Sequence, residues 1–204
     1  MKTYKIEQLI SKKEHTPFIT KFGGQPDWIE TPQWPVSPAW SGRPLKFMGQ
    51  IRLNDFYARL KEPTLAYIFL TQPEDRDDDF YDPDIIFYDE GENAVIIQPN
   101  GKIPEYIQVE ERRIGPTVDN EQIWIPQVTE LEEEETAEFE DIDIDKFCGI
   151  PARIYDDIPN PDSSLLLQLH TGWQPFYINA GAAPTLFVFL GEKKDEGYLF
   201  IEDL

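Results

Sequence analysis

The chain has few of the residues on which common kinds of catalysis and metal binding depend. It contains one cysteine, Cys148, and two histidines, His15 and His170, among 204 residues. A single cysteine excludes an intrachain disulfide and is typical of proteins from reducing compartments. A zinc site would need cysteine and histidine ligands that are missing here. We expect Cys148 to be a small buried packing residue.

Long apolar runs are missing as well. Lysines and glutamates interrupt every apolar stretch in residues 1–15, so this segment does not resemble a signal peptide. No run approaches the ~20 apolar residues that a membrane-spanning helix needs. With 40% hydrophobic residues, a chain of this length has enough apolar material for one core. We therefore expect a cytoplasmic protein that folds as one domain over residues 1–204.

Basic residues are outnumbered by acidic ones, and the net charge is -21. Residues 71–92 hold ten acidic residues against Arg76, and residues 130–145 hold ten acidic residues and no basic one. These two acidic insertions carry nearly all of the net charge. Such surfaces repel nucleic acid and anionic membranes, and they attract basic proteins or cations.

The periodicity of the sequence predicts an α+β fold that is rich in strands. Ile6, Leu9 and Ile10 share one helical face, which predicts a helix over residues 3–14. A second short helix over residues 130–140 competes with disorder as the interpretation of that acidic segment. Runs rich in Ile, Val, Phe and Tyr predict strands. They cover residues 45–53, 65–70, 85–88, 94–98, 107–109, 123–125, 164–170, 185–190 and 197–201.

A weak internal repeat appears when Gln50 is aligned with Gln168. Each glutamine lies in an apolar strand, and each strand is followed by an aromatic one that opens with Thr-Leu, at Thr64 and at Thr185. Sheet proteins also reuse such strings by chance, so both explanations stay open. If the repeat is real, the fold consists of two related β-rich halves that share one core.

Several segments together resemble a known family. They are FGGQPDW, PLKFMGQIRL, LAYIFL, FYDEGENAVII, KFCGIPARIYDD, SLLLQLHTG and TLFVFLG, in that order between residues 21 and 190. This pattern is similar to the YwqG-like family of bacterial domains of unassigned function. The resemblance implies a single mixed, β-rich α+β domain, and it implies no reaction.

Motifs for catalysis, cofactors and metals are weak throughout the chain. There is no Gly-x-Ser-x-Gly, phosphate-binding loop or zincin motif. Asp75, Asp77 and Asp79 match the first three ligand positions of an EF-hand, but Phe80 stands where the loop needs glycine. We expect a solvated acidic loop there and no metal or cofactor, and the shortage of nucleophiles and bases favours a protein that is not an enzyme.

The first functional hypothesis is a noncatalytic domain that binds a basic protein, as an immunity protein binds a basic bacterial toxin. Aromatic side chains supply contact area and carboxylates steer the encounter. The residues expected to contact the partner are Asp77, Asp78, Asp79, Phe80, Tyr81, Glu132, Glu133, Glu134 and Glu135.

The alternative is a small-molecule-binding domain or hydrolase with a pocket between the two halves. An amide buried in an apolar strand needs a partner, which for Gln50 and Gln168 is either main chain or a ligand. His170 and Trp173 follow Gln168 closely and complete this candidate pocket. For Trp28 and Trp34, in the proline-rich stretch, covering the end of a sheet is the favoured role.

Overall fold

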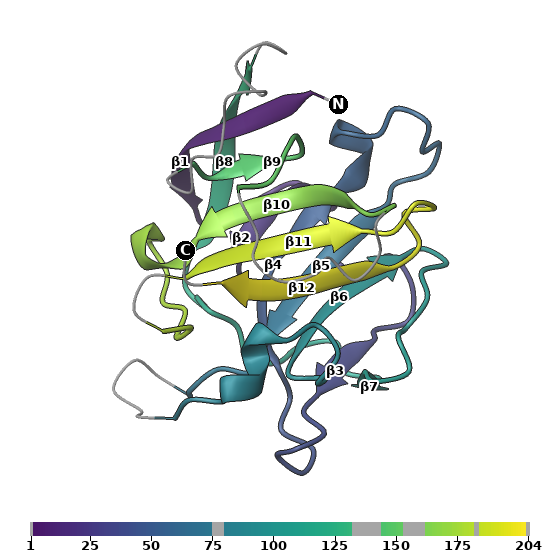
Figure 1. The fold of residues 1–204 in the computed structure, drawn as a ribbon, viewed down its shortest axis with the longest axis vertical. Helices are drawn as coiled ribbons and strands as arrows, with labels where there is room; N and C mark the ends of the chain where they lie inside the picture. The colour runs from purple at the N-terminus through teal and green to yellow at the C-terminus, as the bar shows by residue number, and fades with distance from the viewer. Residues whose placement is uncertain (1, 75–79, 132–143, 153–161, 182–183, 203–204) are drawn as a thin grey trace.

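The computed structural model describes residues 2–74, 80–131, 144–152, 162–181 and 184–202, and the elements in these ranges are almost all strands (Figure 1). The runs predicted over 65–70, 164–170 and 185–190 are strands with those same bounds. The strands are β1 (Thr3–Lys12), β2 (Lys21–Gly23), β3 (Trp34–Val36), β4 (Lys46–Arg52), β5 (Leu65–Leu70), β6 (Asn93–Gln98), β7 (Gln108–Glu110), β8 (Ile123–Leu131), β9 (Lys146–Phe147), β10 (Ser164–His170), β11 (Thr185–Leu190) and β12 (Gly197–Glu202).

The expected α+β class is wrong, because the described residues contain no α-helix. Their only helices are three short 3-10 turns, η1 (Leu53–Asp55), η2 (Pro83–Ile86) and η3 (Thr171–Trp173). The helix predicted over residues 3–14 is instead β1, which pairs with β8 from Thr3 opposite Leu131 to Lys12 opposite Ile123. Pairing along a whole partner strand outweighs the helical spacing of a few apolar residues.

Two further predictions fall in the acidic segments. The strand predicted over residues 85–88 is wrong, since Asp82 accepts a hydrogen bond from the Asp84 amide and Pro83 opens the helical turn η2. Glu130 and Leu131 end β8, and the rest of the helix predicted over residues 130–140 lies outside the described residues.

Ten strands form one sheet with a symmetric order. The order is β12-β11-β10-β9-β1-β8-β2-β4-β5-β6, so four strands flank the central β1-β8 pair on each side. We call β2, β4, β5 and β6 the first half, and β9, β10, β11 and β12 the second half. The remaining strands, β3 and β7, pair with each other as a separate two-stranded sheet.

The two halves match in register as well as in order. Gln50 pairs with Tyr67 in the first half, and Gln168 pairs with Phe187 in the second. The register between the two long strands shifts after Phe47 in one half and after Leu165 in the other. Since Phe47 and Leu165 lie three residues before their glutamines, the repeat seen in the sequence corresponds to equivalent positions in the fold.

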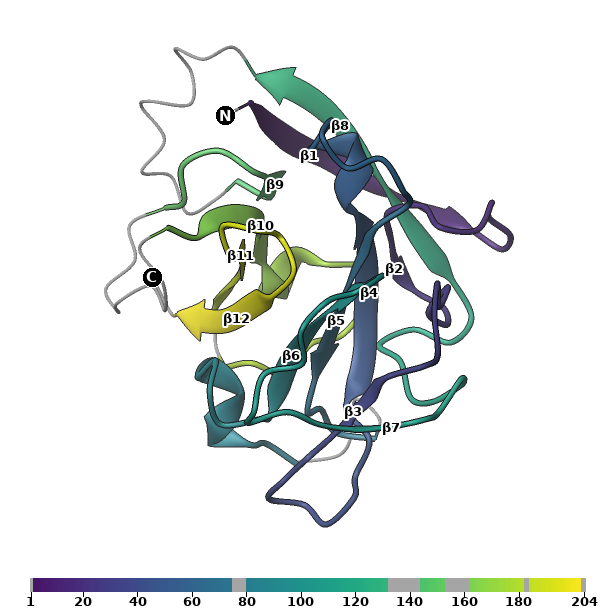
Figure 2. The same ribbon diagram turned by 90° about the vertical axis from the view of Figure 1, so that its right-hand side faces the viewer.

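The sheet curls so that its two halves face each other and enclose the main core (Figure 2). Side chains from both halves meet there, among them Met48, Ile68, Leu167 and Val188. The end strands β6 and β12 pack together at Gly197, where an added Cβ would lie 2.4 Å from Cγ1 of Val95. The absence of a side chain at Gly197 therefore permits the near closure of the sheet.

The proline-rich stretch after β2 covers the outer face of the first half. Trp28 packs on Tyr67 with ring centroids 4.7 Å apart, and the fully buried Trp34 packs on Phe69 at 5.2 Å. Trp34 also donates a hydrogen bond to the Leu45 carbonyl. These two tryptophans belong to a second core on this face of the sheet, whereas the sequence predicted that they cover the end of a sheet.

Candidate functional site

A buried lysine and a buried glutamine fix the turn that follows the first strand of the first half. The Lys21 ammonium donates to the Gln25 carbonyl at 2.7 Å. Opposite Lys21 in the register, the Gln50 amide donates to the Ile19 carbonyl at 2.9 Å and accepts from the Asp27 amide at 2.8 Å. Both side chains are fully buried, so these bonds close the turn without help from solvent.

The second half repeats this arrangement. Lys146 donates to the Ile150 carbonyl at 2.6 Å, and it lies opposite Gln168. The Gln168 amide donates to the Ile144 carbonyl at 2.9 Å and accepts from the Ala152 amide at 2.8 Å. Main-chain partners thus account for Gln50 and Gln168 without a ligand, and each glutamine is bonded within its own half.

The turns themselves have matching backbones. Gly23 and Gly24 have φ of 70° and 62°, and Cys148 and Gly149 have φ of 60° and 82°. Left-handed backbone favours glycine, which explains three of the four residues. The segments KFGGQPD (21–27) and KFCGIPA (146–152) are therefore two copies of one structural turn. We call this repeated unit, with its glutamine, the Lys-Gln turn.

An ionic cluster joins the Lys-Gln turn in the first half. Asp27, whose equivalent is Ala152, lies 2.9 Å from Nε2 of His15 and 3.3 Å from the Lys21 ammonium. Gln50 also donates to the Asp27 carboxylate. Burial raises the pKa of Asp27, but Lys21 and His15 outweigh it and hold that pKa below its usual value. Burial lowers the pKa of Lys21.

The sequence patterns did not predict this cluster or a role for His15. A difference between the two turns was visible in the sequence, because Asp27 is aligned with Ala152 when KFGGQPD is aligned with KFCGIPA. The pairing with His15 depends on how residues 13–20 fold back onto the turn, and no sequence pattern indicates that.

The second half has its own additions around His170. At the position of Thr20 it has Asp145, whose carboxylate accepts from the His170 amide at 2.6 Å and from Nε2 of Gln174 at 2.8 Å. The rings of His170 and Trp173 stack with centroids 4.1 Å apart. Burial raises the pKa of Asp145, and its hydrogen bonds only partly oppose that effect.

A cavity of about 240 Å³ is lined by residues of the segment that follows β10. Its lining comes from the segment that begins with η3 and comprises Thr171, Gly172, Gln174, Pro175, Phe176, Tyr177, Ile178 and Gly181. Gln50, Gln168, His170 and Trp173, the four residues predicted to line a shared pocket, are not part of this lining, and the two glutamines are fully buried.

The acidic insertion over residues 71–92 contains carboxylates that hold the fold together. Glu92 is fully buried and accepts hydrogen bonds from the hydroxyls of Ser37 and Thr71. Asp82 is buried too, and it accepts from Nε1 of Trp40. Because these carboxylates are buried and hydrogen-bonded, they are not available to a partner protein.

Other side chains of this insertion point outward. Tyr81 and Phe87 are 44% and 46% exposed, and so is Trp40, at 46%, which bonds to the insertion through Asp82 but lies outside it. Phe80 is half-buried under Arg43, whose guanidinium carbon lies 3.9 Å from the ring centroid. We call this set the acidic-aromatic end; it consists of the exposed Trp40, Tyr81, Phe87, Asp89 and Glu90 and the half-buried Asp84.

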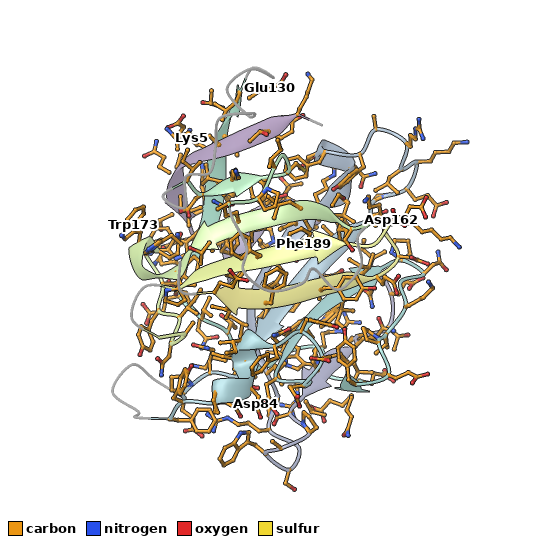
Figure 3. All side chains as sticks on the ribbon, viewed as in Figure 1. Lys5, Asp84, Glu130, Asp162, Trp173 and Phe189 are labelled. Atoms are coloured by element: carbon orange, nitrogen blue, oxygen red, sulfur yellow. The ribbon has the colours of Figure 1, made fainter. Side chains whose placement is uncertain are left out.

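Two described carboxylates, one from each acidic insertion, lie far apart. Asp84 and Glu130 lie at opposite ends of the molecule's longest axis, with Trp173 on a third side (Figure 3). Of the predicted contact residues, Asp77, Asp78 and Asp79 lie outside the described residues, and so do Glu132, Glu133, Glu134 and Glu135. Phe80 and Tyr81 belong to the described residues.

Metal-binding clusters and membrane-spanning helices are both absent from the described part of the chain. No set of three or more His, Cys, Asp or Glu side chains there is arranged to hold a metal ion. The predicted calcium-like positions Asp75, Asp77 and Asp79 fall outside these ranges. None of the helices in the described part of the chain has the length and apolar character needed to cross a membrane.

Comparison with known proteins relates the chain to others at the level of a family. A search of curated proteins gives no match. The model of a family described as a domain of unknown function, DUF1963, matches residues 20–174, which contain both copies of the Lys-Gln turn. The chain therefore belongs to the DUF1963 family of domains of unknown function.

Proposed function

We propose that this protein is a noncatalytic domain that binds a basic protein through its acidic-aromatic end. The observation that carries the proposal is the exposure of Tyr81 and Phe87 in a segment that also exposes Asp89 and Glu90, together with the exposed Trp40, which is bonded to that segment through Asp82. Exposed aromatic side chains surrounded by charge are typical of protein contact surfaces.

The base of this surface is rigid. Trp40 is tied to Asp82, and the Asn93 side chain donates to the carbonyls of Ile85 and Phe87 at 2.8 Å each. The backbone around Phe87 is thus fixed before any partner arrives. A fixed surface loses less conformational entropy on binding than a flexible one, which favours recognition at this end.

Charge determines which partner fits. The chain carries a net charge of -21, and carboxylates accompany the exposed aromatic residues. A basic protein would be attracted over several ångströms, which raises its association rate more than its affinity. Anionic partners such as nucleic acid would be repelled.

The test is a charge reversal of the acidic-aromatic end. The triple variant Asp84→Lys, Asp89→Lys, Glu90→Lys should bind the basic protein encoded by the neighbouring gene at least about tenfold more weakly, a loss of about 1.4 kcal/mol. The matched control is Glu62→Lys, Glu121→Lys, Glu192→Lys, which makes the same charge change at exposed sites elsewhere. Titration calorimetry measures both affinities.

Equal losses in the two triple variants would contradict a specific surface, because net charge alone would then explain binding. A neighbouring gene whose product is not toxin-like and does not bind would contradict the proposal as a whole. A second pair separates contact from charge: Phe87→Ala should weaken binding, whereas Ile114→Ala, which removes a side chain that is 67% exposed elsewhere, should not.

Within the family, we propose that the chain is a YwqG-like member, that it is bacterial and cytoplasmic, and that its partner is a basic toxin which it neutralises as an immunity protein. The order of the segments FGGQPDW, PLKFMGQIRL and KFCGIPA supports the first of these statements. The single cysteine supports a reducing compartment. Co-expression tests the immunity role: the chain should rescue growth of cells that express the neighbouring toxin.

A further inference from the structure

Another cavity, of about 300 Å³, lies at the start of β4. It is formed where the turn before β4, the residues after β5 and the residues before β8 come together. Lys46 pairs with Leu70 there, and the Phe47 amide donates to the Pro116 carbonyl at 2.9 Å. The lining residues are Arg43, Pro44, Lys46, Gln72, Glu74 and Pro116. Pockets for small organic molecules begin at roughly this volume.

The guanidinium of Arg43 has no carboxylate partner within the described ranges. This is unexpected in a chain with 39 acidic and 18 basic residues. Nη2 of Arg43 donates to the Gln72 carbonyl at 2.9 Å, and this bond uses one of the five N–H donors of a guanidinium. Since a guanidinium keeps its charge in proteins, a cation with donors to spare lines the cavity.

Packing holds this guanidinium in place. Its carbon lies 3.9 Å from the Phe80 ring centroid, and Phe80 packs edge-on against Trp40 at 5.2 Å. The main chain at Gln72 is fixed as well, because the buried Gln72 side chain donates to the Asn179 carbonyl at 2.9 Å and accepts from the Asn179 amide at 2.6 Å. The guanidinium therefore needs little further ordering when a ligand binds.

The rest of the lining favours an organic anion with a single charge. Lys46 places an ammonium in the same wall, where it donates to the Glu74 carbonyl at 2.7 Å. Two cations and the one carboxylate of Glu74 give the lining a formal charge of +1, whereas the whole chain carries -21. The chain repels a dianion such as phosphate more strongly than a monoanion. Pro44 and Pro116 supply apolar wall for the body of the ligand.

We propose that this cavity binds a small organic monocarboxylate, whose oxygens accept hydrogen bonds from the Arg43 guanidinium. The planar N–H fork of arginine matches a carboxylate in geometry, and charge-assisted hydrogen bonds of this kind are stronger than neutral ones. The inference does not rest on the proposed protein contact, because the ligand is an anion and Arg43 is not part of the acidic-aromatic end.

The test compares three probes of one shape on the full chain: benzoate, benzamide and benzamidinium, which are anionic, neutral and cationic. NMR follows the Nε–H signals of the seven arginines, with Arg112, which is paired with Glu110, as the internal reference. Benzoate should shift the Arg43 signal saturably with a Kd of roughly 1 mM, as expected for a ligand of a few atoms. Benzamide should bind at least about tenfold more weakly, and benzamidinium should leave the Arg43 signal in place.

Two matched variants locate the site. Arg43→Gln removes the guanidinium and should weaken benzoate binding at least about tenfold, because the charge-assisted hydrogen bonds are lost. Arg59→Gln makes the same change at an exposed site and should leave the affinity unchanged. Saturation transfer to the ring protons of benzoate measures both affinities. Unfolding temperatures establish that the variants are folded, and if Arg43→Gln is not, the comparison of benzoate with benzamide on the unaltered protein decides.

The overturning results are equally definite. Equal affinities for benzoate and benzamide would overturn the anionic class. Equal shifts of Arg43 and Arg112, or no shift of Arg43, would overturn the site. Phosphate that binds more tightly than benzoate would overturn the choice of a monocarboxylate. A loss in Arg59→Gln as large as in Arg43→Gln would show that net charge alone governs binding, and it too would overturn the site.

Discussion

The two halves of the ten-stranded sheet carry the same Lys-Gln turn but differ in what surrounds it. In both halves a buried lysine and a buried glutamine hold the same backbone positions. The first half adds Asp27 where the second has Ala152, and the second half adds Asp145 where the first has Thr20. Each half thus serves as a control for the other.

This comparison separates scaffold from candidate function. A feature that occurs twice in one chain, at equivalent positions and with main-chain partners, is explained by the fold alone. Features without an equivalent at matching positions of the described residues need another explanation, and these include the acidic-aromatic end and the Asp27 carboxylate. Buried glutamines looked like ligand groups in the sequence, and the repetition of their bonds identifies them as structural.

The largest expected effect comes from breaking the shared unit. Gln50→Leu and Gln168→Leu should each lower the free energy of unfolding by about 4 kcal/mol, because each leaves two backbone groups unpaired at roughly 1–3 kcal/mol apiece. Urea denaturation measures this loss. Gln127→Leu is the control, since that exposed glutamine bonds only to the Gln8 side chain, and it should cost less than about 1 kcal/mol. A large loss in only one half would contradict equivalent roles.

The next effect tests the Asp27 carboxylate, which contacts Lys21 and His15 in the first half. Asp27→Asn should cost about 2 kcal/mol at pH 7, below the roughly 3–5 kcal/mol of a fully buried pair, because the side chain keeps 15% exposure. The folded-state pKa of Asp27 is lowered, so its contribution is present above the usual value of 3.8 and is lost as the pH falls through the lower folded value.

The difference between the unaltered protein and Asp27→Asn should therefore shrink as the pH falls below about 4. Urea titrations from pH 7 to pH 3 provide the measurement, with the exposed Asp89→Asn as the control that should show little difference at any pH. A difference that grows on acidification would show that Asp27 is not held ionised by Lys21 and His15.

A third contrast concerns the first left-handed residue of each turn, Gly23 and Cys148. Gly23→Ala should cost about 2–3 kcal/mol, because φ is +70° and the new Cβ would lie 2.7 Å from the Gln122 carbonyl. Cys148→Gly should change stability by at most about 1 kcal/mol, because relief of the left-handed strain offsets the loss of a buried side chain. Thermal unfolding measures both changes. A large loss in Cys148→Gly would show that glycine is not tolerated at this position, which would contradict the equivalence of the two turns.

The smallest perturbation is chemical labelling of Cys148. The thiol is buried, and burial raises its pKa to about 12, so the reactive thiolate is scarce at neutral pH. A thiol reagent should therefore label the native protein slowly and the urea-unfolded protein rapidly. Rapid labelling of the native protein would contradict the packing role expected from the sequence.

Local patterns in the sequence predicted many strands and the repeat. The bounds of β5, β10 and β11 follow from apolar runs ended by polar residues, and Gln50 and Gln168 marked equivalent positions correctly. The helix predicted over residues 3–14 failed because β1 is defined by its partner β8, which lies more than a hundred residues away. Local spacing carries no information on such a partner.

The candidate sites were harder to predict for the same reason. In the acidic insertion, Asp82 and Glu92 look like their neighbours in the sequence, and only contacts with Trp40 and Ser37 make them structural. His170 was identified from its position after a strand, but its contacts with Asp145 and Trp173 depend on how the chain folds around it. Sequence therefore found the segments, and three-dimensional contacts decide which side chains are available.

The most direct test of the central claim, that function lies outside the repeated scaffold, is the salt dependence of association with the basic partner. Stopped-flow rates for the unaltered protein should fall at least about tenfold between low and high ionic strength, because screening weakens electrostatic steering. The triple variant Asp84→Lys, Asp89→Lys, Glu90→Lys should lose most of this dependence. The same salt dependence in both proteins would contradict a functional acidic-aromatic end.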